Sequence, residues 1–128
     1  NLFHGTLESL EGQQVVIRIS QQMLIGTLKS ENSTLAQGVL VKAAVRAEQV
    51  RLFRRQSENR DCDVCFEGRV TDVIFEGERI LYELSVAALS DTLIRVIHHD
   101  QRDFSTFEIG EMVFVGWQSR DMYVFVVD

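Results

Sequence analysis

The chain has 128 residues, of which 45% are hydrophobic and 25% are charged, which is sufficient to bury a core without disulfide bonds. Its formal net charge is −6 and it contains only two lysines, which argues against general binding to nucleic acid or anionic lipid, because both depend on neutralising phosphate. The sequence shows neither a run of about 18 apolar residues that could cross a membrane nor a signal peptide. Because it begins with Asn1 and enters an apolar pattern almost at once, we expect a fragment of a longer protein.

Alternating apolar and polar residues predict β-strands throughout the first half, and no segment keeps a helical period. The predicted strands cover residues 2–10, 14–20, 23–29, 39–46 and 50–55. A polar loop is expected at residues 30–38 and a single helical turn at residues 47–49. The basic run at residues 51–55 does not place its arginines on one side of a strand, which favours a sheet edge or a linker. Residues 56–61 are the most polar stretch and the best candidate for a boundary.

The clearest pattern in the sequence lies at residues 64–86 and predicts a long, bulged hairpin. Apolar residues alternate up to Val70, and the next apolar position, Val73, has the opposite parity. A slip of one residue turns every side chain to the other face, so a strand that stays in one sheet needs a bulge, which we place at Thr71 and Asp72. Gly77 then supplies a turn before a cleanly alternating return strand.

The second half is predicted to contain five strands and one long loop. The strands cover residues 63–75, 79–86, 92–98, 111–117 and 122–127. The loop from His99 to Gly110 carries Phe104 and Phe107 among polar residues. These aromatic side chains either close one end of a barrel, which we favour, or contact another protein. For the second case, the expected partner contact comprises His98, His99, Phe104 and Phe107.

The two halves repeat one pattern at a nearly fixed distance. Phe3, Gly5 and Leu7 precede Phe66, Gly68 and Val70 by 63 positions, and Leu10 precedes Val73 by the same distance. Val15, Ile17 and Ile19 precede Ile80, Tyr82 and Leu84 by 65 positions. Matching periodicity, bulge and turn indicate an internal duplication, with repeats at residues 1–56 and 57–128 packed as one unit. The pattern predicts an all-β fold of two five-stranded barrels of the oligonucleotide/oligosaccharide-binding type, in tandem or with exchanged strands.

Residues that could carry chemistry form no convincing site. Cys62 and Cys65 have the spacing of half a zinc site, but the sequence has no second cysteine pair, and ordinary reduced thiols are expected. The scattered imidazoles of His4, His98 and His99 have no evident nucleophile to activate. We therefore assign no catalytic, cofactor-binding or metal-ligating residue. Trp117 continues an apolar alternation and is expected in the core.

Taken together, these residues resemble the TOBE family, the C-terminal regulatory domains of ATP-binding subunits of bacterial ABC importers, especially the branch serving polyamines and ferric iron. The matching positions are Asn1, Phe3, His4, Gly5, residues 45–50, 66–70 and 73–83, Gly110, residues 113–117 and Asp121. One departure is Ala47, where the family usually has proline. A larger departure is the missing nucleotide-binding domain, so no ATPase residue is carried over.

The resemblance implies a non-enzymatic regulatory and dimerising domain. Its implied partners are a second copy of the same subunit and, through the parent protein, membrane permease subunits, with no nucleic acid. ATP and magnesium would belong to the missing domain, and no cofactor is expected in this fragment. The implied location is the cytoplasm, with the parent protein peripheral to the inner membrane.

Two other functions remain open at this point. The first is a sensor for a small oxyanion such as molybdate or sulfate, because molybdate-binding proteins share the duplicated barrel and residues 42–45 are similar to part of their pattern. The Ser-Ala-Arg-Asn element that opens those proteins is absent. The second is a nucleic-acid-binding barrel, which the negative charge and the placement of aromatic residues at core positions disfavour.

Overall fold

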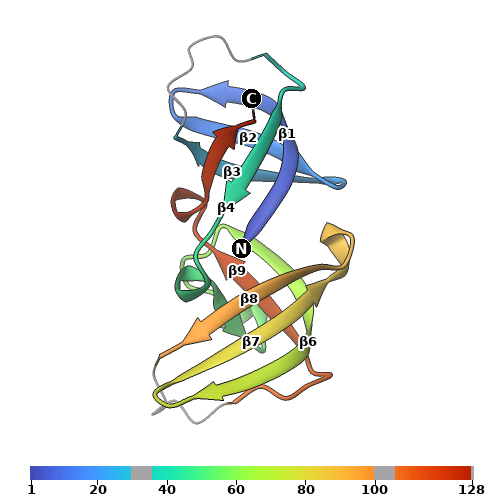
Figure 1. Ribbon diagram of the computed structural model, residues 1–128, viewed down its shortest axis with the longest axis vertical. Helices are drawn as coiled ribbons and strands as arrows, with labels where there is room; N and C mark the ends of the chain where they lie inside the picture. The colour runs from blue at the N-terminus through green and yellow to red at the C-terminus, as the bar shows by residue number, and fades with distance from the viewer. Residues whose placement is uncertain (30–35, 100–105, 128) are drawn as a thin grey trace.

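The computed structural model describes residues 1–29, 36–99 and 106–127, which form ten strands and four short 3-10 turns (Figure 1). The first half contains five strands and two 3-10 turns, which are β1 (Leu2–Glu11), β2 (Gln14–Ile19), β3 (Gln22–Leu28), β4 (Leu40–Ala44), η1 (Ala47–Gln49), β5 (Arg51–Phe53) and η2 (Gln56–Glu58). The second half contains β6 (Val64–Glu76), β7 (Arg79–Val86), η3 (Ala87–Leu89), β8 (Thr92–His98), β9 (Met112–Trp117), η4 (Ser119–Asp121) and β10 (Tyr123–Val126). The all-β prediction is confirmed.

The ten strands form two sheets, each of which takes one strand from the other half of the sequence. The first sheet is a closed barrel in the order β1-β2-β3-β10-β4, and the second has the order β5-β9-β6-β7-β8. In Figure 1 the last strand rises from the lower sheet into the upper barrel, whereas the chain after β4 descends to form β5. The strands are therefore exchanged, and β5 lies at a sheet edge, as its basic run predicted. The repeat boundary between residues 56 and 57 stays a prediction.

Both long hairpins contain a bulge at the equivalent place. The pairing of β1 with β2 shifts register between Leu7 and Ser9, and that of β6 with β7 shifts between Val70 and Asp72. These positions are 63 residues apart in the two halves. The predicted bulge at Thr71 and Asp72 is confirmed, and its recurrence supports the duplication.

One predicted correspondence between the halves is wrong. Leu7 pairs with Ile17 and Val70 with Leu84, so Ile17 corresponds to Leu84 rather than to Tyr82. The cause is the length of the hairpins, because three residue pairs follow the bulge in the first and five in the second. Strand alternation has a period of two, so it could not distinguish a distance of 65 from one of 67.

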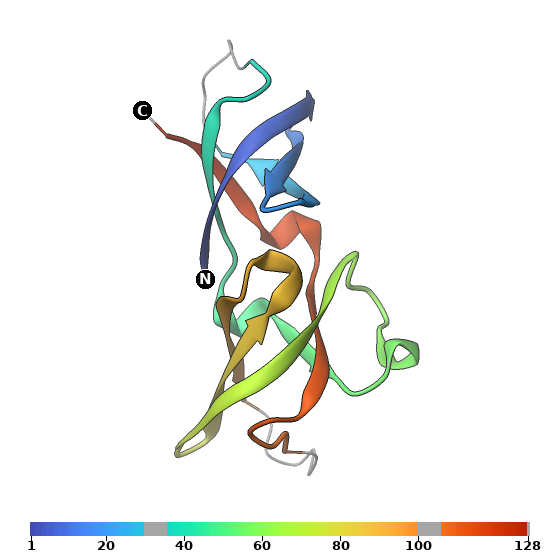
Figure 2. The same ribbon diagram turned by 90° about the vertical axis from the view of Figure 1, so that its right-hand side faces the viewer.

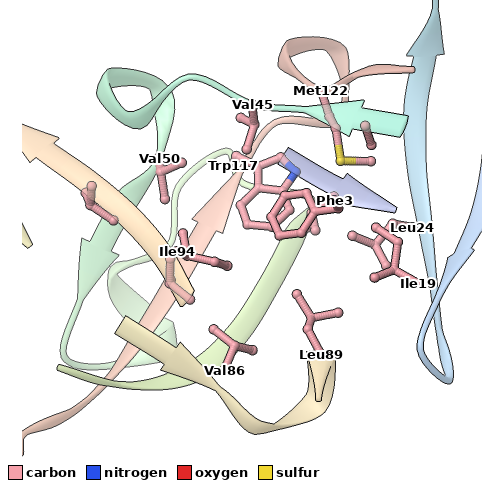
Figure 3. Close-up of a cluster of buried hydrophobic side chains, with 14 of the residues drawn as sticks. Phe3, Ile19, Leu24, Val45, Val50, Val86, Leu89, Ile94, Trp117 and Met122 are labelled. Atoms are coloured by element: carbon pink, nitrogen blue, oxygen red, sulfur yellow. The ribbon is translucent and has the colours of Figure 1, made fainter. Parts of the chain in front are cut away.

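The two sheets share one hydrophobic core. Trp117 on β9 is fully buried and stacks on Phe3 of β1 with ring centroids 5.9 Å apart, which confirms its predicted place. Figure 3 shows this pair between apolar side chains of the first barrel and side chains of the second sheet such as Ile94. Because the core crosses from one sheet to the other and the strands are exchanged, the halves are packed as one body.

Candidate partner-binding site

The second sheet leaves a groove at the position where the first barrel closes. In the first barrel, the amide of Thr27 donates to the carbonyl oxygen of Met122 at 2.8 Å, and the amide of Lys29 donates to that of Val124 at 2.9 Å. These bonds join β3 to β10 in parallel and complete the barrel.

The corresponding strands of the second sheet, β8 and β5, are not hydrogen-bonded neighbours. Within the described part of the chain, Ile97 and His99 make no backbone hydrogen bond to Val50 or Leu52, their counterparts across the seam. A groove of about 440 Å³ lies there instead. It is lined by Glu48, Val50, Arg51, Leu52, Phe53, Arg54, Glu58, Ile97, His98, His99 and Phe107.

Phe107 lines this groove with a buried aromatic ring. Its side chain is buried, its backbone amide donates to the Tyr82 hydroxyl at 3.2 Å, and its ring meets the Tyr82 ring edge-on at 5.5 Å. The ring of His98 lies 6.1 Å from that of Phe107 and 5.4 Å from that of Tyr82. The interpretation that a loop aromatic closes the barrel end therefore fits Phe107, whereas Phe104 lies outside the described residues.

Arg54, which directly follows β5, contacts this aromatic cluster. Its guanidinium lies 4.4 Å from the centre of the Phe107 ring, donates to the Thr106 carbonyl oxygen at 2.8 Å and donates to the Glu111 carboxylate at 2.7 Å. The Glu111 carboxylate also accepts from the backbone amide of Glu108 at 3.0 Å. This backbone bond first, and then Arg54, hold the pKa of Glu111 below its usual range.

The structure thus brings together three of the four residues proposed for partner contact. His98 and Phe107 touch, and His99 is exposed at the same groove. Sequence reasoning missed Tyr82 and Arg54, and the only signal for Arg54 was its place in the basic run. Contact of these residues with a partner stays a prediction.

Other reactive side chains form no site in the described ranges. Cys62 and Cys65 are free thiols, and burial raises the pKa of both, which makes them poor nucleophiles. No group of three or more His, Cys, Asp or Glu side chains in residues 1–29, 36–99 and 106–127 is arranged to hold a metal ion. None of these residues forms a helix long and apolar enough to cross a membrane.

The family model of the TOBE domain matches residues 43–125. The chain belongs to the TOBE domain family. Over 122 residues it is 30% identical to the spermidine/putrescine import ATP-binding protein PotA of Rubrobacter xylanophilus, a match that covers 94% of this chain and 30% of the relative. The chain therefore spans about a third of the length of that protein. The expected resemblance, including its polyamine branch, is confirmed.

A solved structure has the same fold. It is that of the cytoplasmic molybdate-binding protein ModG in a form with molybdate bound, with a TM-score of 0.84 and 23% sequence identity. The match covers 99% of this TOBE domain and 96% of the ModG chain. At this identity the likeness shows the fold, a tandem of barrel-like units, and no more.

Proposed function

We propose that this TOBE domain is the regulatory and dimerising part of the ATP-binding subunit of a bacterial ABC importer and is not itself an enzyme. The observation that carries the proposal is the similarity to PotA across 94% of the chain. In such a parent protein, ATP and magnesium would bind elsewhere, membrane permease subunits would be further partners, and the assembly would lie on the cytoplasmic side of the inner membrane.

The fold suits a domain that holds partners in place. Exchanged strands and a core that crosses both sheets resist relative movement of the halves, because such movement would break β-ladders and expose apolar side chains. A rigid body offers a constant contact surface while sites elsewhere in a subunit open and close. The described residues do not support a catalytic function. Burial raises the pKa of both thiols, and the acidic and imidazole side chains of these residues form no metal-binding cluster.

Sedimentation equilibrium of the isolated chain tests the dimerising function. We expect a reversible dimer whose fraction rises with protein concentration, because without the parent subunit only the domain contact holds the copies together. A strict monomer at millimolar concentration would contradict a self-sufficient dimer contact. Hydrolysis of ATP by the same sample is expected to stay at background, and turnover above it would contradict the non-enzymatic assignment.

A second candidate function is the binding of a small oxyanion, which the structural likeness to a molybdate-bound protein favours. Isothermal titration of the chain with molybdate, tungstate and sulfate tests it. Saturable heat with molybdate or tungstate would support an oxyanion sensor. The absence of heat, together with an unchanged melting temperature, would reject it.

A further inference from the structure

The outer surface of the first barrel carries a face that is both apolar and basic. Strand registers place Leu2, Ala44 and Tyr123 in one row and His4, Lys42 and Phe125 in the next, across β1, β4 and β10. These rows contain no Asp or Glu. We call this surface, with Leu40 and Lys29 at its margins, the basic face.

The basic face exposes more apolar surface than folding of the barrel requires. Leu40, Leu2 and Phe125 are 62%, 54% and 42% exposed, although one strand neighbour of each is buried, namely Val41, Phe3 and Val124. Both lysines of the chain lie here, and the ammonium group of Lys29 lies 4.5 Å from the centre of the Tyr123 ring. Contiguous exposed apolar side chains of this kind mark an interaction surface. In a chain with a net charge of −6, the positive charge here favours an acidic partner surface.

The tip of the β6–β7 hairpin has the complementary character. Phe75 is 68% and Ile74 43% exposed. At the adjacent turn Glu76 pairs with Arg79 at 3.6 Å, so Glu78 carries the net negative charge of the tip. This tip exists because the hairpin has two more residue pairs beyond its bulge than the β1–β2 hairpin. The first barrel closes with the shorter hairpin, so the extension is not a requirement of the fold.

The strands of the basic face and the tip of the β6–β7 hairpin lie on the same side of the molecule, the strands in the first barrel from the middle upward and the tip at the far end of the second sheet. In Figure 2 the start of β1, β4 and the end of β10 lie on the left above the middle, and the tip of the β6–β7 hairpin lies on the left at the bottom. A twofold axis perpendicular to the long axis would bring the basic face of one copy onto the hairpin tip of the other. The same operation would form the second, identical contact, which is the requirement of a closed dimer.

We propose that two copies of this TOBE domain bind each other head to tail through these two contacts, with the Phe75 tip of each copy on the basic face of the other. This inference rests on the proposed dimerising function and names the surfaces that perform it. Lys42 would face the acidic turn of the partner, and Phe125 and Leu40 would be covered by its apolar tip.

Charge reversal tests the pairing of the surfaces. Lys42→Glu and Glu78→Lys, each alone, are expected to weaken dimerisation by about tenfold or more, because each dimer then holds two like-charged contacts. An equimolar mixture of the two variants should recover dimerisation, since a mixed dimer has one native contact and one with its charges exchanged. The Lys42→Glu/Glu78→Lys double variant should recover it as well. All measurements use sedimentation equilibrium at low salt, where such contacts are least screened.

Two further variants test whether the effects come from these surfaces. Glu11→Lys places the same reversal on the turn of the shorter hairpin and should leave dimerisation unchanged. Deletion of residues 74, 75, 80 and 81 trims the β6–β7 hairpin to the length of its counterpart and should abolish the dimer. Circular dichroism and Trp117 fluorescence report whether each variant keeps its fold.

The outcomes separate the inference from the function on which it rests. A monomeric wild-type chain would contradict both the dimer contact and these surfaces. A wild-type dimer that both single reversals leave intact would overturn the surfaces but not the dimerising function. Weakening by the single reversals without recovery in the mixture would also overturn the head-to-tail pairing.

Discussion

Two equivalent glycines show how local packing differs between the halves. A side chain on Gly5 would overlap the carbonyl oxygen of Arg18, whereas one on Gly68, which is 63 positions later, would first meet the end of the Leu84 side chain at 3.3 Å. The carbonyl oxygen of Arg18 belongs to the backbone and cannot shift as easily as the methyl group of Leu84.

Gly5→Ala is therefore expected to lower the free energy of unfolding by about 1–3 kcal/mol, the usual cost of overpacking. Gly68→Ala serves as the matched control and should cost clearly less. Urea denaturation of both variants measures the difference. Equal losses would contradict the packing described for the two bulged strands.

Glu111 supplies a pH-dependent part of the stability. The amide of Glu108 and the guanidinium of Arg54 bind its ionised form, so its pKa in the folded chain lies below that of an unfolded glutamate. A lowered pKa stabilises the fold above the ordinary glutamate range, and this contribution disappears as the pH falls through the folded-state pKa.

Glu111→Gln should therefore melt at a lower temperature than the wild-type chain at pH 7. The difference should shrink as the pH falls through the folded-state pKa of Glu111, because the wild-type carboxyl then becomes protonated as well. Thermal unfolding across this pH range is the measurement. A gap of constant size would show that the carboxylate bonds do not act as described.

At the scale of the elements, the two seams of the molecule differ. The amides of Thr27 and Lys29 donate across the closed seam between β3 and β10, and their counterparts Ile97 and His99 have no such partner on β5 in the described chain. We expect hydrogen exchange at Thr27 and Lys29 to be slower than at Ile97 and His99 by at least about tenfold. Equal protection at the two seams would mean that the second barrel closes in solution.

The strands were predictable because side-chain alternation has a strong signature. The parity change before Val73 was enough to locate the bulge at Thr71 and Asp72, and Trp117 was correctly placed in the core. The extra length of the second hairpin was not deducible, because a shift of two residues preserves alternation. Strand exchange was left open, since a short strand such as β5 carries no signal for the sheet it joins.

The candidate site was predictable only in part. A loop aromatic among polar residues suggested that Phe107 closes a barrel end, and its buried ring on Tyr82 agrees. Tyr82 lies on β7 and Arg54 directly after β5, far apart in the sequence, and no pattern in the sequence indicates that both meet Phe107. The groove itself depends on a missing ladder between β5 and β8, which is a property of the assembled sheet.

At the scale of the whole molecule, strand exchange makes each sheet depend on both halves of the sequence. A division after residue 56 would leave the first part without β10 and the second without β5. It would also separate Phe3 from Trp117, whose rings stack in the shared core. Neither part should then complete a sheet alone.

Expression of residues 1–56 and 57–128 as separate chains tests this mutual dependence most directly. Each is expected to lack a cooperative unfolding transition, and Trp117, the single tryptophan, should emit as a solvent-exposed side chain in the isolated second part. Mixing the two should restore both the transition and the blue-shifted emission of a buried tryptophan. Cooperative folding of either part by itself would contradict a fold whose halves complete each other.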